Sequence, residues 1–448
     1  MSYQTALASM YALGHELANA PSHKFDLAHM RVLMGALHHP ERKFPAVLIA
    51  GTNGKGSTAA TLASIVQASG VRTGLYTSPH LVRINERIRI NGDEISDDDF
   101  ALLHGVVDRT AERLVEEREL PWHPSFFEML TAIAFEYFAR NKVEMAVLEV
   151  GMGGRLDATN VVEPRVSVIT DISLDHQKFL GNTVSEIARE KAGIIRPGGV
   201  VVTLPQQPRA NDVIGNTIME LGAQVVSAVP YVPPVSPNSP EYTGVADARP
   251  ISSYPLQVRG QEILVESPLV GRHQLRNIAL AIATAEVLGH QGFSITPQTI
   301  EQGIRQTHWP GRFQVIPAER GAPEYIFDVA HNPAGAWALR SALSTSYEDR
   351  PMTFVFGAMR DKAIGEMAEI LFPLAERVIA TRSDNPRSAT PDEIREAAAR
   401  TATDIEDAVD VPSALARARS LAGSHGIVVI TGSIYIVGEA MRALGVKV

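Results

Sequence analysis

The sequence contains no cysteine, few aromatic residues and no long apolar segment. The absence of cysteine excludes disulfide frameworks, thiolate zinc sites and cysteine nucleophiles, and it agrees with a reducing compartment. The start of the chain lacks a basic region followed by an apolar run, so we expect no secretory signal. The uncharged stretch 221–240 contains five prolines, which a membrane-spanning helix would not carry. We therefore expect a cytoplasmic protein without a membrane partner.

Positive charge is also scarce. Lysine and arginine together number 41 against 50 acidic residues, which gives a net charge of −9. Proteins whose main partner is nucleic acid are usually basic, so we expect no nucleic-acid partner. The chain is 45% hydrophobic and 20% charged, as globular proteins are, and its 448 residues suffice for two or three domains.

Short β-branched runs alternate with glycine-rich turns and helical segments, which is the pattern of βα units in a mostly parallel sheet. The predicted strands are 45–50, 73–77, 146–150, 166–171, 200–203, 325–329, 353–356, 377–381 and 427–431. Helices are predicted over 58–69 and 274–288, and capping boxes mark helix starts at Ser125 and Thr183. The proline-rich segment 230–255 is predicted as an irregular loop or small β excursion, with antiparallel strands after it.

The segment WPGRF, residues 309–313, is predicted to be a hinge, because Pro310 and Gly311 suit neither a helix nor a central strand. We predict an α/β protein of two domains. The large N-terminal domain, residues 1–308, has a P-loop-type, mostly parallel sheet. The smaller C-terminal domain, residues 309–448, is a doubly wound α/β domain.

The segment GTNGKGS connects the first predicted strand to a helix. Backbone N–H groups at a helix start, together with a lysine, bind phosphate oxygens, so the segment predicts a nucleoside triphosphate site. Its residues are Gly51, Thr52, Asn53, Gly54, Lys55, Gly56 and Ser57. The glycine spacing differs from the Walker pattern. The alternative is a tight turn with an exposed lysine, and the loop alone does not select one reaction.

Acidic and polar side chains follow the neighbouring predicted strands. Glu149 ends an apolar strand at the sheet edge where ligands bind, which indicates Mg²⁺ beside a triphosphate. The alternative is an ion pair with Arg155 or an interaction with a helix end. Ser78 offers a hydroxyl for the metal or belongs to a turn before Pro79.

His176 lies after the next strand, and its position favours a second metal ligand over a structural histidine. Asp171 and Asp175 are rival ligands, and Asp175 also suits a local turn. Lys191 falls near a helix end, where it could interact with the helix dipole.

Several segments together resemble one family. They are GTNGKGS, YTSPHLVRINERIRINGDEIS, LEVGMGGRLDATN, SLDHQKFLGNTVSEIAREKAGIIRPG, WPGRF, FDVAHNPAG and TGSIYIVGE. In order along nearly the whole chain, they resemble folylpolyglutamate synthases of the Mur-ligase superfamily, which in many bacteria are also dihydrofolate synthases. The resemblance implies an ATP-dependent ligase that forms an acyl phosphate on a folate or dihydropteroate and couples it to L-glutamate, usually as a monomer.

The resemblance also implies roles for single residues. The phosphate loop would bind ATP, Ser78 with Glu149 one Mg²⁺, and His176 with Glu149 a second, while Lys191 would be carbamylated. The implied nucleotide contacts are Asn277, Arg312, Asp328 and His331. The implied pterin contacts are Phe126 and Asp157. Residues 360–362 and Ser433 are candidate glutamate contacts only because they follow predicted strand ends. The alternatives are a surface position for Asn277, a helix cap for Asp328 and a core position for Phe126.

Two other functions remain open on the sequence. A cell-wall precursor ligase would use the same chemistry on a UDP-sugar, although TSPHL and GGRLDATN favour the folate branch. A P-loop NTPase switch would hydrolyse nucleotide without forming an amide, and it would not need the second α/β half. That half indicates two substrates that meet across a closing cleft.

Overall fold

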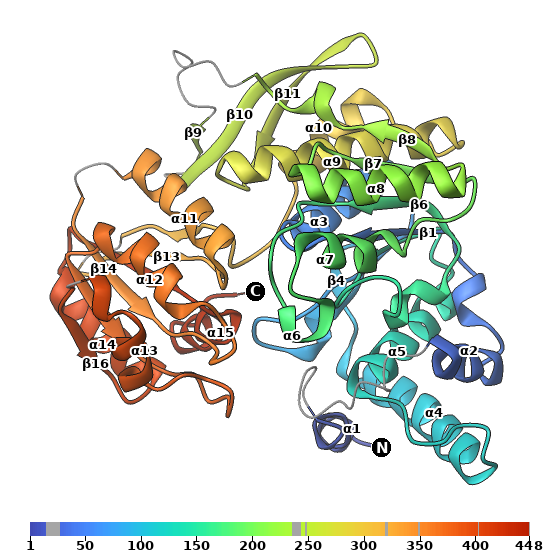
Figure 1. Cartoon of the computed structure of the whole chain (residues 1–448), viewed down its shortest axis with the longest axis horizontal. Helices are drawn as coiled ribbons and strands as arrows, with labels where there is room; N and C mark the ends of the chain where they lie inside the picture. The colour runs from blue at the N-terminus through green and yellow to red at the C-terminus, as the bar shows by residue number, and fades with distance from the viewer. Residues whose placement is uncertain are drawn as a thin grey trace.

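The computed structural model describes residues 1–14, 27–234, 243–246, 249–318, 321–347, 350–401 and 403–447. Sheets of eight, three and six strands organise these residues (Figure 1). No helix within these ranges is long and apolar enough to cross a membrane. The predicted α/β class is confirmed, and the cytoplasmic location stays a prediction.

The largest sheet has the order β4-β3-β2-β5-β1-β6-β7-β8. The parallel part of the sheet consists of β2, β5, β1, β6, β7 and β8. The strands β3 and β4 form an antiparallel edge next to β2. The strands are β1 (Ala46–Ala50), β2 (Thr73–Tyr76), β3 (Ile88–Ile90), β4 (Asp93–Glu94), β5 (Met145–Glu149), β6 (Pro164–Ile169), β7 (Val200–Thr203) and β8 (Gln224–Ser227).

Helices cover both faces of this sheet, which is why β1 is apolar and buried throughout. Val47 and Ile49 face the layer of α3 (Lys55–Ala68), α9 (Arg272–His290) and α10 (Pro297–Arg305). Leu48 faces the other layer. That layer contains α1 (Tyr3–Ala12), α2 (Leu27–Ala36), α4 (Asp97–Glu116), α5 (Phe126–Arg140), α7 (Val184–Ala192) and α8 (Pro208–Leu221). The predicted capping boxes at Ser125 and Thr183 are confirmed.

The proline-rich segment contains more strand than the sequence predicts. The three-stranded antiparallel sheet consists of β9 (Thr243–Ala246), β10 (Arg249–Val258) and β11 (Gln261–Ser267). Of the two predicted readings, the small β excursion is therefore confirmed for residues 249–255, and the irregular loop is wrong there. The pairs of β10 with β9 cover residues 249–252 and those with β11 cover 252–258, so Pro250 and Pro255 each have a single neighbouring strand. Residues 235–242 and 247–248 lie outside the described part.

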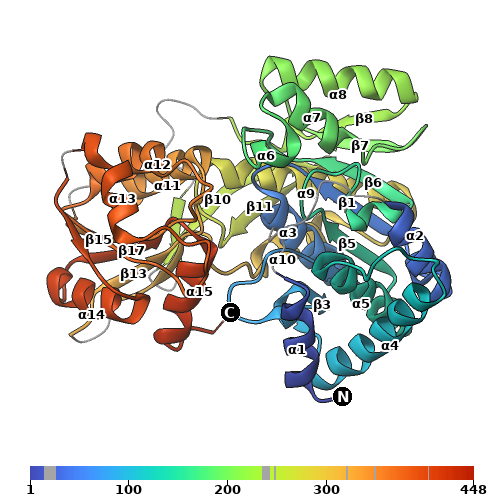
Figure 2. The same ribbon diagram turned by 60° about the horizontal axis from the view of Figure 1, so that its bottom comes forward.

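The six-stranded sheet lies beside the large one in both ribbon views (Figures 1 and 2). Its order is β12-β13-β17-β14-β15-β16, with only β12 antiparallel. The strands are β12 (Gln314–Ile316), β13 (Glu324–Phe327), β14 (Met352–Phe356), β15 (Arg377–Ala380), β16 (Ile405–Asp407) and β17 (Ile427–Thr431). The predicted doubly wound arrangement is confirmed, because helices pack on both faces. One face carries α11 (Pro333–Ser346), α12 (Ile364–Leu371) and α13 (Pro391–Ala397), and the other α14 (Val411–Ala422) and α15 (Ile434–Ala443).

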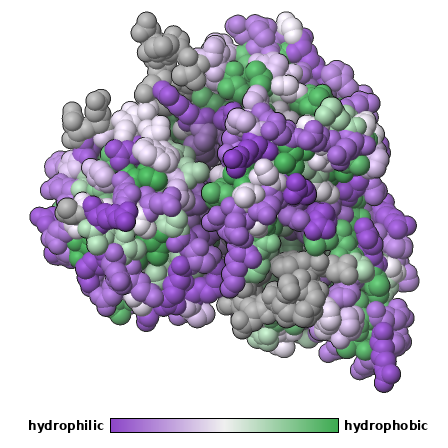
Figure 3. Space-filling model, in the orientation of Figure 1, coloured by the Kyte–Doolittle hydropathy of each residue, from purple (hydrophilic) through white to green (hydrophobic). Residues whose placement is uncertain are grey.

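Hydrophilic residues cover most of the molecular face in Figure 3, and the hydrophobic residues on it form small scattered groups.

The chain passes from α10 to β12 through residues 309–313, which belong to neither a helix nor a strand. This segment therefore joins the two large sheets.

Candidate active site

The phosphate loop lies between the carboxyl end of β1 and the start of α3. The helix begins at Lys55, three residues before its predicted start, so Lys55 and Ser57 both belong to its first turn. Gly54 caps the helix with φ +86°, and a Cβ there would lie 2.1 Å from the side-chain oxygen of Asn277. Glycine is required here because the backbone is in the left-handed region and because there is no room for a Cβ atom.

The loop is fixed to the segment that follows β6. The backbone N–H groups of Thr52 and Asn53 donate to the Asp171 carbonyl oxygen over 2.8 and 3.2 Å. The Thr52 hydroxyl donates to the Ser173 carbonyl oxygen over 3.0 Å. A Cβ on Gly51 would lie 1.8 Å from the Thr170 hydroxyl. These contacts hold the loop at the carboxyl edge of the sheet, where a ligand can reach the amino end of α3.

Two lysine ammonium groups meet at this loop. Lys55 donates to the Thr52 carbonyl oxygen over 3.3 Å, and Lys191, from the last turn of α7, donates to that of Gly51 over 2.7 Å. The side chain of Lys191 is therefore directed at the loop, and its predicted place near a helix end is confirmed. Burial and the charge of Lys55 lower the pKa of Lys191 to about 7.

The lowered pKa of Lys191 predicts a pH-dependent stability. Above about pH 7 the folded chain holds this amine neutral, whereas the unfolded chain keeps the proton up to about pH 10.4. The unfolded state therefore binds more protons in this window, and the free energy of unfolding rises with pH. Between pH 7 and 9, the Lys191→Met variant should gain about 2 kcal/mol less stability than the wild type. Urea unfolding in CO₂-depleted buffer measures this, and parallel pH profiles of the two proteins would contradict it.

Glu149 ends β5 at the same sheet edge, with 4% of its surface exposed. Its carboxylate accepts a hydrogen bond from the Ser78 backbone N–H over 3.2 Å. The alternative ion pair with Arg155 is wrong, because Arg155 pairs with Glu190 at 2.9 Å. Burial lowers the pKa of Arg312, and the negative charges of Asp328 and Glu149 oppose that shift. Glu149 thus belongs to one electrostatic cluster with residues from the second half of the chain.

The junction segment and the strand β13 supply this second group. Asp328 follows β13 and accepts hydrogen bonds from the backbone N–H groups of Phe313 and Ala330, both over 2.9 Å. The alternative helix cap is wrong, because Asn332 caps α11. The Arg312 guanidinium lies 5.9 Å from the Trp309 ring centroid. A Cβ on Gly56 would lie 2.6 Å from that ring, so Trp309 packs directly on the phosphate-loop helix.

Asn277 lies on α9 and is only 3% exposed, so the alternative surface position is wrong. Its amide donates to the Gln274 side chain over 2.8 Å, and its oxygen faces Gly54. Asn53 of the loop accepts a hydrogen bond from Asn332 over 3.0 Å. Polar side chains from both halves of the chain therefore contact the phosphate loop.

Asp175 organises a second cluster, which sequence reasoning missed. Its carboxylate pairs with Lys362 at 2.6 Å, lies 3.6 Å from His331 and 3.9 Å from His176, and accepts from the Asn332 amide. Burial alone would raise the pKa of Asp175, but the hydrogen bond from His331 and the positive charges of its neighbours hold it well below its usual range. Asp171, the other rival metal ligand, pairs with Arg276 at 2.6 Å. Nothing local in the sequence connects Asp175 to Lys362, because they lie 187 positions apart.

His176 precedes the short helix α6 (Gln177–Leu180) with φ +49°. Burial lowers the pKa of His176 to about 4, so the imidazole is neutral at pH 7 and a ring nitrogen can act as a ligand. Within the described ranges, no group of three or more His, Asp or Glu side chains is arranged to hold a metal ion.

The proposed pterin contacts are both buried. Phe126 begins α5 and stacks on the Tyr11 ring at 6.1 Å, with the Arg87 guanidinium 5.4 Å from its centroid, so it has the core position of the alternative reading. Asp157 accepts hydrogen bonds from the Met152 backbone and from Thr159. Burial raises the pKa of Asp157.

The residues predicted to contact glutamate lie in different surroundings. Lys362 reaches the cluster around Asp175, whereas Arg360 pairs with Glu393 at 3.0 Å and Ser433 caps α15. Of these residues, Lys362 is the one that the fold brings to the site.

The ion pair between Asp175 and Lys362 predicts a stability effect. Both side chains are at most 10% exposed, and Lys362→Met would leave the Asp175 carboxylate buried without its closest cation. We expect a loss of about 3 kcal/mol in the free energy of unfolding. In the double variant with Asp175→Asn the loss should be smaller, because no buried charge is left uncompensated. Denaturant unfolding of the four proteins measures the coupling, and additive losses would contradict it.

Comparisons with known proteins agree with this geometry. A family model described as Mur ligase middle domain matches residues 125–285, and one described as Mur ligase, glutamate ligase domain matches residues 311–434. The dihydrofolate synthase/folylpolyglutamate synthase of Bacillus subtilis is 35% identical over 428 residues, which cover 94% of this chain and 95% of the relative. The chain belongs to the folylpolyglutamate synthase family.

Solved structures of this family have the same fold over the whole chain. A Mycobacterium tuberculosis folylpolyglutamate synthase complexed with ADP and AMPPCP superposes with a TM-score of 0.86 at 32% identity, covering 99% of both chains. E. coli FolC in complex with DHPP and ADP gives a TM-score of 0.79 at 27% identity, covering 99% of this chain and 98% of the other. The predicted membership of the folylpolyglutamate synthase family is thus confirmed.

Proposed function

We propose that this chain is an ATP-dependent ligase that adds L-glutamate to a folate carboxylate and also converts dihydropteroate to dihydrofolate. The observation that carries the proposal is the convergence at one sheet edge. The phosphate loop and Glu149 lie there. From the second half of the chain, Arg312 interacts with Glu149, and Lys362 pairs with Asp175 after β6. The names of the relatives and the nucleotides in their structures support ATP and folate as substrates.

The chemistry requires activation of the acceptor. A carboxylate is a poor electrophile whose charge repels nucleophiles, so the γ-phosphoryl group of ATP is transferred to it to give an acyl phosphate. The glutamate amine then attacks the carbonyl carbon, and phosphate leaves from the tetrahedral intermediate. The protein contributes mainly positioning and preorganised charge.

The proposed nucleotide site combines residues from both halves of the chain. The backbone of residues 51–57 and the Lys55 ammonium would bind the phosphates, and Asn277, Arg312, Asp328 and His331 would contact the rest of ATP. The Arg312 guanidinium interacts with the carboxylates of Asp328 and Glu149, so Arg312 and Asp328 would also orient the nucleotide from the second half.

Two magnesium ions fit the donor set. Mg²⁺ takes one or two protein oxygens and completes its shell with phosphate oxygens and water, so it does not need a cluster of three carboxylates or histidines. Ser78 with Glu149 would hold one ion, and the neutral His176 with Glu149 the other. When bound, Mg²⁺ would neutralise charge on the transferring phosphoryl group.

We propose that Lys191 is carbamylated in the active enzyme. A pKa near 7 keeps much of the amine neutral at physiological pH, and the neutral amine is the form that adds to CO₂. The product carries a negative oxygen pair in place of an ammonium, so it would attract a cation near the loop.

The acceptor site would include Phe126 and Asp157, and the structure of the E. coli relative with DHPP supports a pterin substrate. We further propose a division into domains 1–308 and 309–448, with the closing motion at residues 309–313, a monomeric state and a cytoplasmic location. The segment without helix or strand between α10 and β12 supports this division.

One assay tests the function. Purified protein receives ATP, Mg²⁺ and labelled L-glutamate with dihydropteroate, tetrahydrofolate or a UDP-muramyl acceptor in turn. Transfer of label to the two pterin acceptors is the expected result. Transfer only to the UDP-muramyl acceptor, or phosphate release without transfer to any acceptor, would overturn the proposal in favour of a cell-wall ligase or a nucleotide switch.

A further inference from the structure

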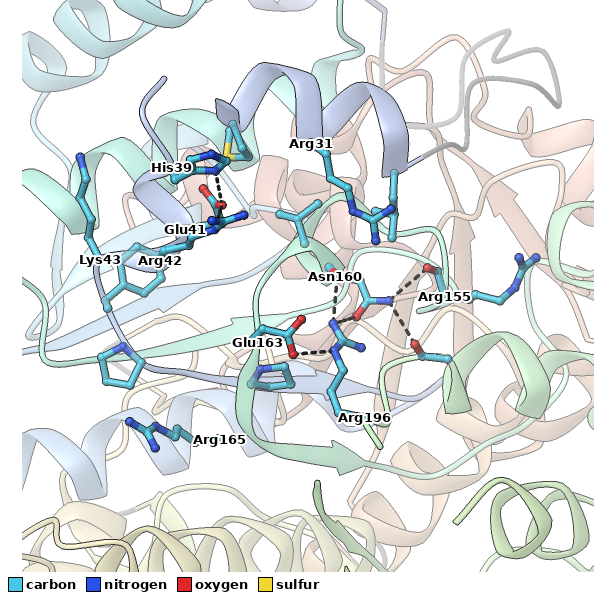
Figure 4. A pocket seen from close by; sticks show the side chains of 17 residues that line it. Arg31, His39, Glu41, Arg42, Lys43, Arg155, Asn160, Glu163, Arg165 and Arg196 are labelled. Atoms are coloured by element: carbon cyan, nitrogen blue, oxygen red, sulfur yellow. Dashed lines mark hydrogen bonds and ion pairs between the residues drawn. The ribbon is translucent and has the colours of Figure 1, made fainter. Parts of the chain in front are cut away.

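A cavity of about 1120 Å³ is shown in Figure 4, and none of the residues 51–57 lines it. Its walls include Pro45, directly before β1, and Pro164, the first residue of β6. These positions mark the amino edge of the parallel strands, whereas the phosphate loop follows their carboxyl edge. The helix α2 and the turn after α7 complete the walls. The phosphate loop therefore does not account for this cavity, although Arg155 and Asn160 in its wall flank Asp157 of the proposed acceptor site.

The cavity wall is basic in an acidic protein. The whole chain has a net charge of −9, yet six cationic side chains and two carboxylates line this space. The cations are Arg31, Arg42, Lys43, Arg155, Arg165 and Arg196, and the carboxylates are Glu41 and Glu163. Such a concentration of one sign attracts anions into a concave site.

Nearby carboxylates pair with only part of this positive charge. Glu41 pairs with Arg42 at 3.2 Å, Glu163 with Arg196 at 3.3 Å, and Glu190 with Arg155 at 2.9 Å. Within the described ranges, the side chains of the three remaining cations have no ion-pair partner. These are Arg31, Lys43 and Arg165. No ion pair with a described residue therefore neutralises their charges.

Two of the guanidinium groups face each other. Arg196 is held by hydrogen bonds to the Asn160 carbonyl and side-chain oxygens and to the Val162 carbonyl oxygen. Arg31 extends toward it from α2 on the opposite wall (Figure 4). Burial lowers the pKa of Arg196, Glu163 opposes this, and the positive charge of Arg31 lowers it further. The two cations therefore repel each other, and an anion between them would relieve the repulsion.

We propose that this cavity binds a linear small-molecule oligoanion, an oligophosphate or an oligocarboxylate, through Arg31, Arg165 and Arg196. Guanidinium forks match both carboxylate and phosphate oxygens. A space of about 1120 Å³ holds a ligand much larger than one inorganic anion, and cations on opposite walls suit several linked charges. The binding does not depend on the proposed reaction.

Calorimetric titration of the full-length chain tests the site, with ADP saturating and Mg²⁺ in excess so that the phosphate loop is occupied. The probes are inorganic tripolyphosphate and tri-γ-glutamate, with inorganic phosphate and L-glutamate as single-unit comparisons. We expect one trimeric probe to bind at least tenfold more tightly than its single unit. The trimer that binds identifies phosphate or carboxylate as the source.

The double variant Arg31→Gln/Arg165→Gln should bind that probe at least tenfold more weakly. The matched control Arg209→Gln/Arg377→Gln removes two exposed charges on α8 and β15 and should bind like the wild type. Thermal unfolding checks folding, and the ligand-free pocket variant should melt no lower than the wild type because it has less repulsion. Failure of both trimers to bind the wild type, or equal binding by the pocket variant, would overturn the proposal. If the pocket variant is less stable, Lys43→Gln/Arg165→Gln provides the same comparison.

Discussion

Replacement of Lys55 by alanine is expected to lower the turnover of glutamate addition by about 10³-fold or more, as loss of preorganised charge stabilisation does. The ammonium group lies in the first turn of α3, where its only direct partner among the described residues is the Thr52 carbonyl oxygen at 3.3 Å. Its charge is therefore free to act on a phosphoryl group, and water in the space left by alanine would not replace a fixed cation. Steady-state rates of labelled glutamate transfer measure the effect.

Lys447→Ala serves as the matched control, because it removes an exposed lysine near the chain end. Its turnover should equal that of the wild type. A Lys55→Ala variant that folds normally by circular dichroism and keeps near-normal turnover would contradict the assignment of the phosphate site. Since Lys191 has Lys55 as a charged neighbour, the same variant should also raise the pKa of Lys191.

The second large effect is expected for Glu149→Ala, with turnover again lowered by about 10³-fold. The carboxylate is 4% exposed, and it lies beside the Ser78 backbone and the Arg312 guanidinium. Its loss would remove the carboxylate assigned to both Mg²⁺ ions and would leave Arg312 with Asp328 as its remaining acidic neighbour. Turnover measured across a range of Mg²⁺ concentrations should also show a higher requirement for the metal.

Glu112→Ala, an exposed change on α4, controls for the loss of one negative charge. Glu149→Gln keeps the shape of the side chain and separates charge from packing. If the glutamine variant keeps wild-type turnover with an unchanged Mg²⁺ requirement, Glu149 has no role in metal binding or catalysis.

Much of the fold follows from local patterns. The predicted strands 200–203 and 427–431 match β7 and β17, and the capping boxes at Ser125 and Thr183 form as predicted. In each case the sequence pattern and the strand or helix start that it predicts lie within the same few residues. The early start of α3 was missed because Lys55, Gly56 and Ser57 have no apolar periodicity, and their helix is fixed by contacts with Trp309 and Asn277.

The errors share a physical cause. Residues 249–255 contain two prolines, so local propensity opposes a strand, yet β10 forms because β9 and β11 each pair with a different part of it. Lys191 lies near a helix end as predicted, but its hydrogen-bond partner could not be predicted, because Gly51 lies 140 positions earlier. Asp328 looked like a helix cap because its true donors include Phe313, 15 positions away.

The sequence by itself determined the alternation of strands and helices, the phosphate loop at a helix start and the family to which the chain belongs. The first two features depend on hydrogen bonds and apolar periodicity over a few neighbouring residues, whereas the family was indicated by the resemblance of motifs along nearly the whole chain. Only the tertiary structure decided which charges meet: Asp175 with Lys362, Arg312 with Glu149, and Arg31 with Arg196. Such pairs depend on strand order and on how the two large sheets pack, because these set the distance between residues far apart in the chain.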